Sequence, residues 1–360
     1  MKNYTHYNMD DIISRNSNIN IVYGERSNGK SYQFKHKIMF TDDIINGDRR
    51  FILVRRKKDE LTTEKIERYF QDVDIERITK GEYDCIDVWR REVFLAKFNH
   101  QKFKKERGKK IGYVIPLERE QDYAGASFLD VDNIIYEEFM SRDRYLYDEP
   151  NKLMNLYCTV DRKRGTTKLW LCGNSISRVC PYLADWDIMD IMRTQEQGTI
   201  IDRDFDVSED ETVKMSIEYC RNTGATSYVI GSHAGMLSTG EWQSDPQPHL
   251  PKSLKNYDIS FISVFTFKQF SFLVRYLTDK ETGEHVWFIC DKRGTIKDNT
   301  WEITDIIKQD HKCFRDPYTV KTTNKRIKAI FDDFRENKIF YSTDLTGTDF
   351  KQAIDFIIKK

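Results

Sequence analysis

One short stretch, residues 19–31, limits what this chain can fold into more than any other. Ile19 to Tyr23 reads as a buried strand, and the residues that follow fit the phosphate-loop pattern Gly-x-x-x-x-Gly-Lys-Ser/Thr. The two glycines allow backbone angles that other residues avoid, so the loop can turn its N–H groups inward around an anion. A helix expected from about Ser31 to Phe40 adds its dipole to the same place. The pattern predicts a nucleotide site, and an ordinary glycine-containing turn is the alternative.

The loop also supplies candidate ligands for ATP and Mg²⁺. Lys30 is expected to reach the β- and γ-phosphates, and the Ser31 hydroxyl is expected to ligate Mg²⁺. The residues predicted to bind the nucleotide are Gly24, Glu25, Arg26, Ser27, Asn28, Gly29, Lys30, Ser31 and Tyr32.

A second stretch, Val131 to Met140, has the shape of a Walker B motif, because an apolar strand ends there in two adjacent carboxylates. The first of them, Glu137, can hold the Mg²⁺ shell. The second, Glu138, can orient and deprotonate the attacking water. The usual residue at the Glu137 position is Asp. This departure affects the predicted metal role of Glu137 and not the predicted base role of Glu138. An exposed Glu-Glu turn is the alternative.

The end of another expected strand, Lys168 to Cys172, carries a third candidate. Asn174 follows this strand, and a polar residue at the end of the strand beside Walker B is well placed to sense the γ-phosphate. An asparagine of an ordinary turn is the alternative.

Composition sets the broader limits. The 360 residues are 39% hydrophobic and 32% charged, which indicates a soluble globular protein with room for two domains. Lys+Arg and Asp+Glu both number 58, so net charge does not indicate a nucleic-acid partner. Locally, His100 to Lys110 holds six Lys/Arg against Glu106 alone, which suits a solvated loop or a contact with a phosphate backbone.

The cysteines and the apolar runs indicate the compartment. The seven cysteines lack paired metal-ligand spacing, which argues against a zinc site and a disulfide framework, and for a reducing compartment. The N-terminus lacks the apolar core of a signal peptide, and no apolar run is long enough to span a bilayer. We therefore expect a cytoplasmic protein without a membrane partner.

The chain is predicted to have three parts. Residues 1–206 form an ATPase domain, whose alternating strands and helices imply a mostly parallel central sheet with ligands at the carboxyl ends of its strands. Residues 207–250 form a linker or hinge subdomain, in which Val213 to Arg221 is an expected helix. Residues 251–360 form a C-terminal α+β domain.

The motifs together describe an additional-strand (ASCE) P-loop ATPase, and the sequence resembles one family of these in more detail. This family is the DNA-packaging (encapsidation) ATPases of small short-tailed phages, relatives of the large terminases. The resemblance runs from Val22 to about Leu183. It rests on Gly-Glu-Arg-Ser-Asn-Gly-Lys-Ser-Tyr with Arg26 inside the loop, Leu-Val-Arg-Arg at 53–56, Val-Ile-Pro-Leu at 114–117, Ile-Tyr-Glu-Glu-Phe at 135–139, Thr-Val-Asp-Arg-Lys-Arg at 159–164, and Asn-Ser-Ile-Ser-Arg-Val-Cys-Pro-Tyr at 174–182.

The resemblance implies a homo-oligomeric ring, with a pentamer as the suggested size, that docks on the portal of a procapsid in the host cytoplasm. Such a ring pumps double-stranded DNA at the expense of ATP, and a packaging RNA is a further candidate partner. Arg162 falls where the family carries its trans-acting arginine finger, with Arg164 as the fallback. Two solvated turn arginines are the alternative.

The family's C-terminal domain resembles RNase H folds, which in large terminases carry an acidic metal-binding cluster that cuts DNA. The acids available here have no spacing typical of a nuclease site; they are Asp258, Asp279, Asp291, Asp344 and Asp349. We therefore expect a vestigial nuclease domain that docks on DNA or the capsid. The rival interpretations are a helicase or small-molecule kinase, a terminase with an active nuclease, and a nucleotide-gated clamp.

Overall fold

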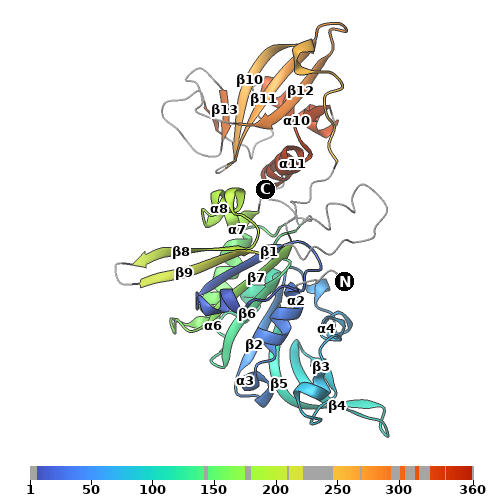
Figure 1. The fold of residues 1–360 in the computed structure, drawn as a ribbon, viewed down its shortest axis with the longest axis vertical. Helices are drawn as coiled ribbons and strands as arrows, with labels where there is room; N and C mark the ends of the chain where they lie inside the picture. Colours follow the sequence, from blue (N-terminus) through green and yellow to red (C-terminus); the bar gives the residue numbers. More distant parts are fainter. Residues whose placement is uncertain are drawn as a thin grey trace. The chain divides into compact units, whose positions relative to one another are not determined.

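The computed structural model describes residues 6–141, 145–174, 180–208, 211–221, 246–267, 270–292, 301–304, 313–315, 325–336 and 338–358. The chain divides into two compact units. The first comprises Met1–Ser175 and Thr194–Glu241, and the second comprises Ile176–Arg193 and Trp242–Lys360 (Figure 1).

The first unit is built on a nine-stranded sheet with the strand order β3-β4-β5-β2-β6-β7-β1-β9-β8. In that order the strands are Cys85–Trp89, Glu92–Asn99, Lys104–Pro116, Arg50–Arg55, Val131–Glu137, Lys168–Asn174, Ile19–Gly24, Glu211–Tyr219 and Thr199–Ser208. The six neighbouring strands β5, β2, β6, β7, β1 and β9 run parallel. β4 pairs antiparallel with β5, β3 with β4, and β8 with β9. The mostly parallel central sheet predicted from the sequence is therefore present.

The order of the strands matters for the site. β7 lies between β1, which leads into the phosphate loop, and β6, which carries the two glutamates. An inserted strand at this place is what the ASCE interpretation requires. Because all three strands are parallel, their carboxyl ends meet at one edge of the sheet.

Helices cover both faces of this sheet. They are α1 (Asp10–Ser14), α2 (Lys30–Phe34) with a π-helical turn at Lys35–Met39, α3 (Asp42–Asn46), α4 (Thr63–Tyr69), α5 (Ile75–Ile78) and α6 (Glu149–Asp161). Ile135 of β6 belongs to a buried cluster with Phe34 of α2, whereas the next residue, Tyr136, contacts Glu149 of α6. Successive strand residues point to opposite faces, so α2 and α6 cover opposite sides of the sheet.

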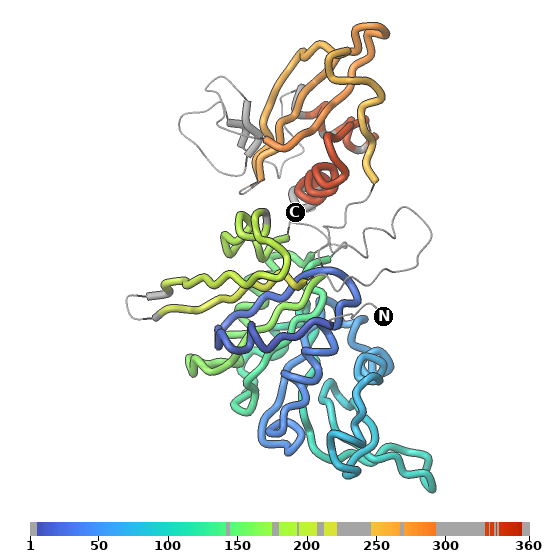
Figure 2. The backbone as a smooth tube through the Cα atoms, in the orientation of Figure 1, coloured from blue at the N-terminus to red at the C-terminus, as the bar shows by residue number. Residues whose placement is uncertain are grey.

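Two predictions about elements are wrong. Val213 to Arg221 was expected to be a helix, but Glu211–Tyr219 forms β9, within the range predicted as a linker. The side chains of this segment alternate between apolar and polar, which suits a strand next to β1. The basic run was expected to be a loop, but from Lys104 onward it belongs to β5, and the β4–β5 hairpin extends from the body of the first unit (Figure 2).

The second unit holds a six-stranded sheet with the order β14-β13-β10-β11-β12-β15. In that order the strands are Cys313–Arg315, Trp301–Thr304, Tyr257–Phe267, Phe270–Asp279, His285–Asp291 and Ile339–Tyr341. Its helices are α7 (Pro181–Asp185), α8 (Met189–Thr194), α10 (Lys325–Arg335) and α11 (Asp344–Ile358). Phe350 of α11 packs edge-on against Phe272 of β11, with ring centroids 5.3 Å apart, and anchors the helix on the sheet. This is the α+β composition predicted for residues 251–360. The predicted boundary at residue 206 is wrong for Ile176–Arg193, which belongs to the second unit. In the part of the chain that the structure describes, no helix has the length and apolar character needed to cross a membrane.

Candidate functional site

The phosphate loop joins β1 to α2 through a backbone that its residues are suited to adopt. Gly29 has φ +99°, in the left-handed region where glycine meets no steric penalty. Gly24 is needed for a different reason, because a Cβ there would lie 3.0 Å from Cβ of Cys220, which follows β9. The sheet neighbour and the turn therefore each fix one glycine of the motif.

Lys30 lies inside this loop with only 5% of its surface exposed. Its Nζ donates to the carbonyl of Glu25 at 2.5 Å and to Oδ1 of Asn28 at 3.1 Å. The same Oδ1 accepts the backbone N–H of Lys30 at 3.2 Å. The predicted residues Glu25, Asn28 and Lys30 thus gather around one point, while Arg26, Ser27 and Tyr32 lie exposed on the outside of the loop.

Glu137 lies at the end of β6 and is 5% exposed. Its carboxylate accepts a hydrogen bond from the hydroxyl of Tyr69 at 2.8 Å. Burial raises the pKa of the Glu137 carboxyl above its ordinary value, against the Tyr69 hydrogen bond, the charge of Arg55 and the nearby Ser31 hydroxyl, which lower it. The two predicted metal ligands, Ser31 and Glu137, therefore lie near each other at the carboxyl edge of the sheet.

Glu138 faces away from its neighbour. Its backbone is in the left-handed region at φ +58°, and its side chain is 61% exposed. Nη2 of Arg55 donates to the Glu138 carboxylate at 2.8 Å, and Nη1 lies 3.8 Å from the Glu137 carboxylate. Arg55 also contacts Glu60 at 3.1 Å, so one guanidinium holds three acids. The predicted metal ligand and the predicted base thus point in different directions.

A buried ion pair fixes the backbone around these glutamates. Arg56 donates to both carboxylate oxygens of Glu149, at 2.9 and 3.1 Å, and to the carbonyl of Phe139 at 2.8 Å. Tyr136 donates its hydroxyl to the same carboxylate at 2.7 Å. This network joins β2, the end of β6 and the start of α6. Sequence reasoning missed it, although the two consecutive arginines after β2 were a visible signal.

Asn174 pairs with Gly24 in the register of β7 and β1, so it lies next to the start of the phosphate loop. This is the position expected for a residue that senses the γ-phosphate. The rest of the stretch Ser175 to Val179 lies outside the described residues.

Arg162 lies at the other end of the same strand. It follows α6 in a turn with φ +48°, is exposed, and donates to the carbonyl of Ala126 at 2.7 Å. β7 then runs from Lys168 to Asn174, about 20 Å at roughly 3.3 Å per residue, before it reaches Gly24. Arg162 is therefore not brought together with the phosphate loop of its own subunit.

Arg164 has a different environment from Arg162. Its guanidinium donates to the carbonyls of Leu129 at 2.7 Å, Val131 at 3.0 Å and Val160 at 3.0 Å. These bonds join the turn to β6 and α6. Arg164 is thus engaged in holding the turn, which leaves Arg162 as the exposed member of the pair.

The donor set fits Mg²⁺, because the hydroxyl of Ser31 and the carboxylate of Glu137 are hard oxygen ligands that lie near each other. In the second unit, two of the candidate nuclease acids are already engaged in hydrogen bonds to the backbone. Asp279 caps a turn by accepting the N–H groups of Glu281 and Thr282, and Asp344 accepts the N–H of Gln247. Within the described ranges, no group of three or more His, Cys, Asp or Glu side chains could hold a metal ion.

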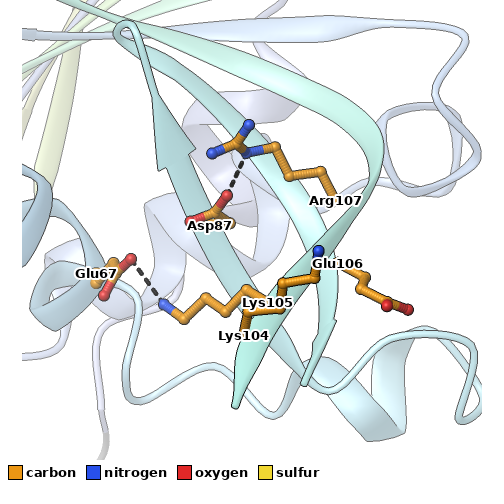
Figure 3. Close-up of a pocket in the computed structure, with 6 residues that line it drawn as sticks. All are labelled: Glu67, Asp87, Lys104, Lys105, Glu106 and Arg107. Atoms are coloured by element: carbon orange, nitrogen blue, oxygen red, sulfur yellow. Dashed lines mark hydrogen bonds and ion pairs between the residues drawn. The ribbon is translucent and has the colours of Figure 1, made fainter. Parts of the chain in front are cut away.

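The basic run forms an ion-paired surface. A groove of about 720 Å³ beside β5 is lined by Glu67, Asp87, Lys104, Lys105, Glu106 and Arg107 (Figure 3). Lys105 pairs with Glu67 at 2.7 Å, and Arg107 pairs with Asp87. Lys102, Lys109 and Lys110 also have acidic partners, namely Glu106, Glu82 and Glu92. Among the described residues, Lys104 alone of the six cations has no ion-pair partner.

Comparison with known proteins gives a consistent picture. Residues 1–266 match the family model described as podovirus DNA encapsidation protein (Gp16). The DNA packaging protein of Bacillus phage phi29 is 26% identical over 273 residues, covering 72% of each chain. That of Bacillus phage B103 is 29% identical over 265 residues, covering 71% of this chain and 73% of the relative. A solved structure of the bacteriophage phi-29 viral genome packaging motor assembly, 20% identical, matches with a TM-score of 0.54 over 98% of this chain and 99% of that chain, which shows a shared fold.

Proposed function

This chain belongs to the podovirus DNA encapsidation protein (Gp16) family, and from that premise we propose that it hydrolyses ATP to move double-stranded DNA into a viral procapsid. The observation that carries the proposal is the parallel strand order β6-β7-β1, which brings the phosphate loop and the Glu137–Glu138 pair to one carboxyl edge of the sheet. It joins the phosphate loop to the Walker B strand as an ATPase of this class needs.

The residues then divide the chemistry among them. The loop N–H groups and Lys30 bind the phosphates, and Ser31 and Glu137 hold Mg²⁺, which neutralises phosphate charge when bound. Glu138 accepts the proton of the attacking water once its carboxylate leaves Arg55. Asn174, beside Gly24, senses the γ-phosphate.

The ring and its partners are also part of the proposal. The remoteness of Arg162 from its own loop supports a role on a neighbouring subunit, where a guanidinium stabilises the charge on the γ-phosphate. A homo-oligomeric ring, suggested to be a pentamer, then docks on the portal of a procapsid in the host cytoplasm, with a packaging RNA as a further partner.

For the second unit we propose an RNase H-like fold that docks on DNA or the capsid without cutting DNA. The sheet supports this, since three antiparallel strands, β10 to β12, are extended on one side by the parallel strands β13 and β14. The engagement of Asp279 and Asp344 in local hydrogen bonds also supports it. Plasmid nicking that requires Mg²⁺ or Mn²⁺ and disappears on mutating Asp258 or Asp291 would instead favour an active terminase nuclease.

The central test is ATP turnover with and without double-stranded DNA. Lys30→Ala should abolish nucleotide binding or turnover, because the loop loses the cation proposed to bind the β- and γ-phosphates. Glu138→Gln should still bind ATP but turn it over about 10²- to 10⁴-fold more slowly, the usual contribution of a general base.

The control is Glu118→Gln, a glutamate change away from the loop. Near-normal turnover by Glu138→Gln would remove that residue as the base. A wild-type protein whose turnover ignores DNA would contradict translocation.

A further inference from the structure

Tyr69, the last residue of α4, places its part-buried hydroxyl group against the Walker B carboxylate. Its hydroxyl donates to Oε1 of Glu137 at 2.8 Å. α4 belongs to the connection between β2 and β3, so this hydroxyl comes from a segment 68 residues before its partner. No motif in the sequence indicates the contact.

The same tyrosine is held from the phosphate-loop side. Nζ of Lys35 donates to the backbone carbonyl of Tyr69 at 2.9 Å and lies 4.8 Å from the centre of its ring. Lys35 is 5% exposed and forms an ion pair with Asp72. Lys35 follows Ser31 by four residues, so the two side chains lie on one side of their helix.

Tyr69 therefore lies between the helix that carries one predicted metal ligand and the strand that carries the other. This arrangement helps to explain how Glu137 can stand where an aspartate is usual. A glutamate has one more rotatable bond than the aspartate usual at this place, so its carboxylate needs more restraint to stay beside Ser31. The hydroxyl supplies that restraint by binding Oε1, while Oε2 faces Arg55 at 3.8 Å.

We propose that Tyr69 is a positioning residue that holds the Glu137 carboxylate in place for the metal of an Mg²⁺–nucleotide complex. The inference rests on the proposed function, and it deepens that function by naming a group that sets the metal requirement. Groups that hydrogen-bond a metal ligand from outside typically change metal affinity 10- to 100-fold when removed.

The test is binding rather than turnover. Wild-type and Tyr69→Phe proteins are titrated with ATPγS at a series of Mg²⁺ concentrations and in EDTA. The Mg²⁺ concentration that gives half of the metal-dependent gain in affinity should rise 10- to 100-fold in Tyr69→Phe, while affinity in EDTA stays unchanged. The matched control is Tyr157→Phe, which also removes a buried hydroxyl bond, 3.1 Å to the carbonyl of Thr167, but does so away from Glu137. Its Mg²⁺ requirement should equal that of the wild type.

Repeating the substitution in a Glu137→Asp protein tests whether Tyr69 acts through the Glu137 carboxylate. Glu137→Asp withdraws the carboxylate by one methylene, so adding Tyr69→Phe to it should cause little further change. An unchanged Mg²⁺ requirement in Tyr69→Phe, or equal effects of the substitution in both backgrounds, would overturn the inference while leaving the proposed function intact. A wild-type protein that binds no ATPγS under any of these conditions would overturn both.

Discussion

Glu218 is a carboxyl group that the fold keeps from water, one strand away from the phosphate loop. It lies on β9 with 8% of its surface exposed and accepts the hydroxyl of Tyr7 at 2.6 Å. Burial raises the pKa of Glu218 to about 7, the Tyr7 hydrogen bond lowers it, and the charge of Asp11 raises it further. The folded protein therefore binds this proton more tightly than the unfolded chain does.

The stability of the fold should consequently fall as the pH rises through this range. Because the folded pKa lies above the unfolded one, the contribution is complete below about pH 4 and is lost as the pH passes 7. Relative to Glu218→Gln, the wild type should lose up to about 3 kcal/mol of unfolding free energy between pH 4 and pH 8. Urea unfolding of both proteins at several pH values measures this. Parallel pH profiles would show that Glu218 titrates normally.

At this scale the sequence predicts the residues of a contiguous motif and misses their distant partners. Lys30, Ser31 and Glu137 follow from spacing alone, because the loop and the strand end impose their types. Arg55 and Tyr69 reach the glutamates from 83 and 68 residues away. The Arg55-Arg56 pair is visible in the sequence, but nothing near either residue identifies its partner. Such contacts depend on strand order, which a single sequence does not determine.

Among the elements, the β4–β5 hairpin changes most between sequence and structure. Its lysines suggested a basic surface, but five of the six cations pair with acids, four of which come from outside the run. Lys104 is the exception, and the neighbouring Phe103 is 84% exposed at the tip. A contact with the DNA backbone through this hairpin should therefore depend on Lys104.

Single substitutions can separate the two kinds of lysine. Lys104→Ala should lower the affinity for duplex DNA and reduce the dependence of log affinity on log salt by about one, as expected for one lost phosphate contact. Lys105→Ala is the control and should have little effect, because the charge it removes is balanced by Glu67. Fluorescence anisotropy at several salt concentrations measures both. Equal losses in the two variants, or none, would exclude the hairpin as described.

β9 shows how an element can be mistaken. Val213, Met215, Ile217 and Tyr219 alternate with polar residues, which is the period of a strand. The nearby glycines and prolines are typical of a linker, and for this reason the sequence wrongly predicts that the segment lies outside the sheet. Its pairing with β1 buries Met215 and Ile217, which no linker would do.

At the scale of the whole molecule, the parallel sheet separates the chemistry from the proposed finger. Arg162 and the phosphate loop lie at opposite ends of β7 and β1. If the finger acts on a neighbour, an Arg162→Ala protein should bind ATP normally yet hydrolyse it slowly. Mixing it with Glu138→Gln subunits should restore some ATP turnover, because one kind of interface then pairs an intact base with an intact finger.

The matched control for that experiment is Lys163→Ala, the next residue of the same exposed turn. It should leave ATP turnover close to that of the wild type. Assembly of mixed rings is checked by native mass spectrometry. Mixed rings without any recovered turnover would argue that Arg162 acts within its own subunit or only maintains the turn.

The turn after α6 also bears on how such a phage gene tolerates mutation. Arg164 donates to several backbone carbonyls that hold this corner of the domain, whereas Arg162 is exposed beside it. Substitutions at the two positions should therefore impair DNA packaging for different reasons. Substitution of Arg164 should lower the amount of folded protein, whereas substitution of Arg162, if it is the finger, should leave the protein folded but unable to package DNA.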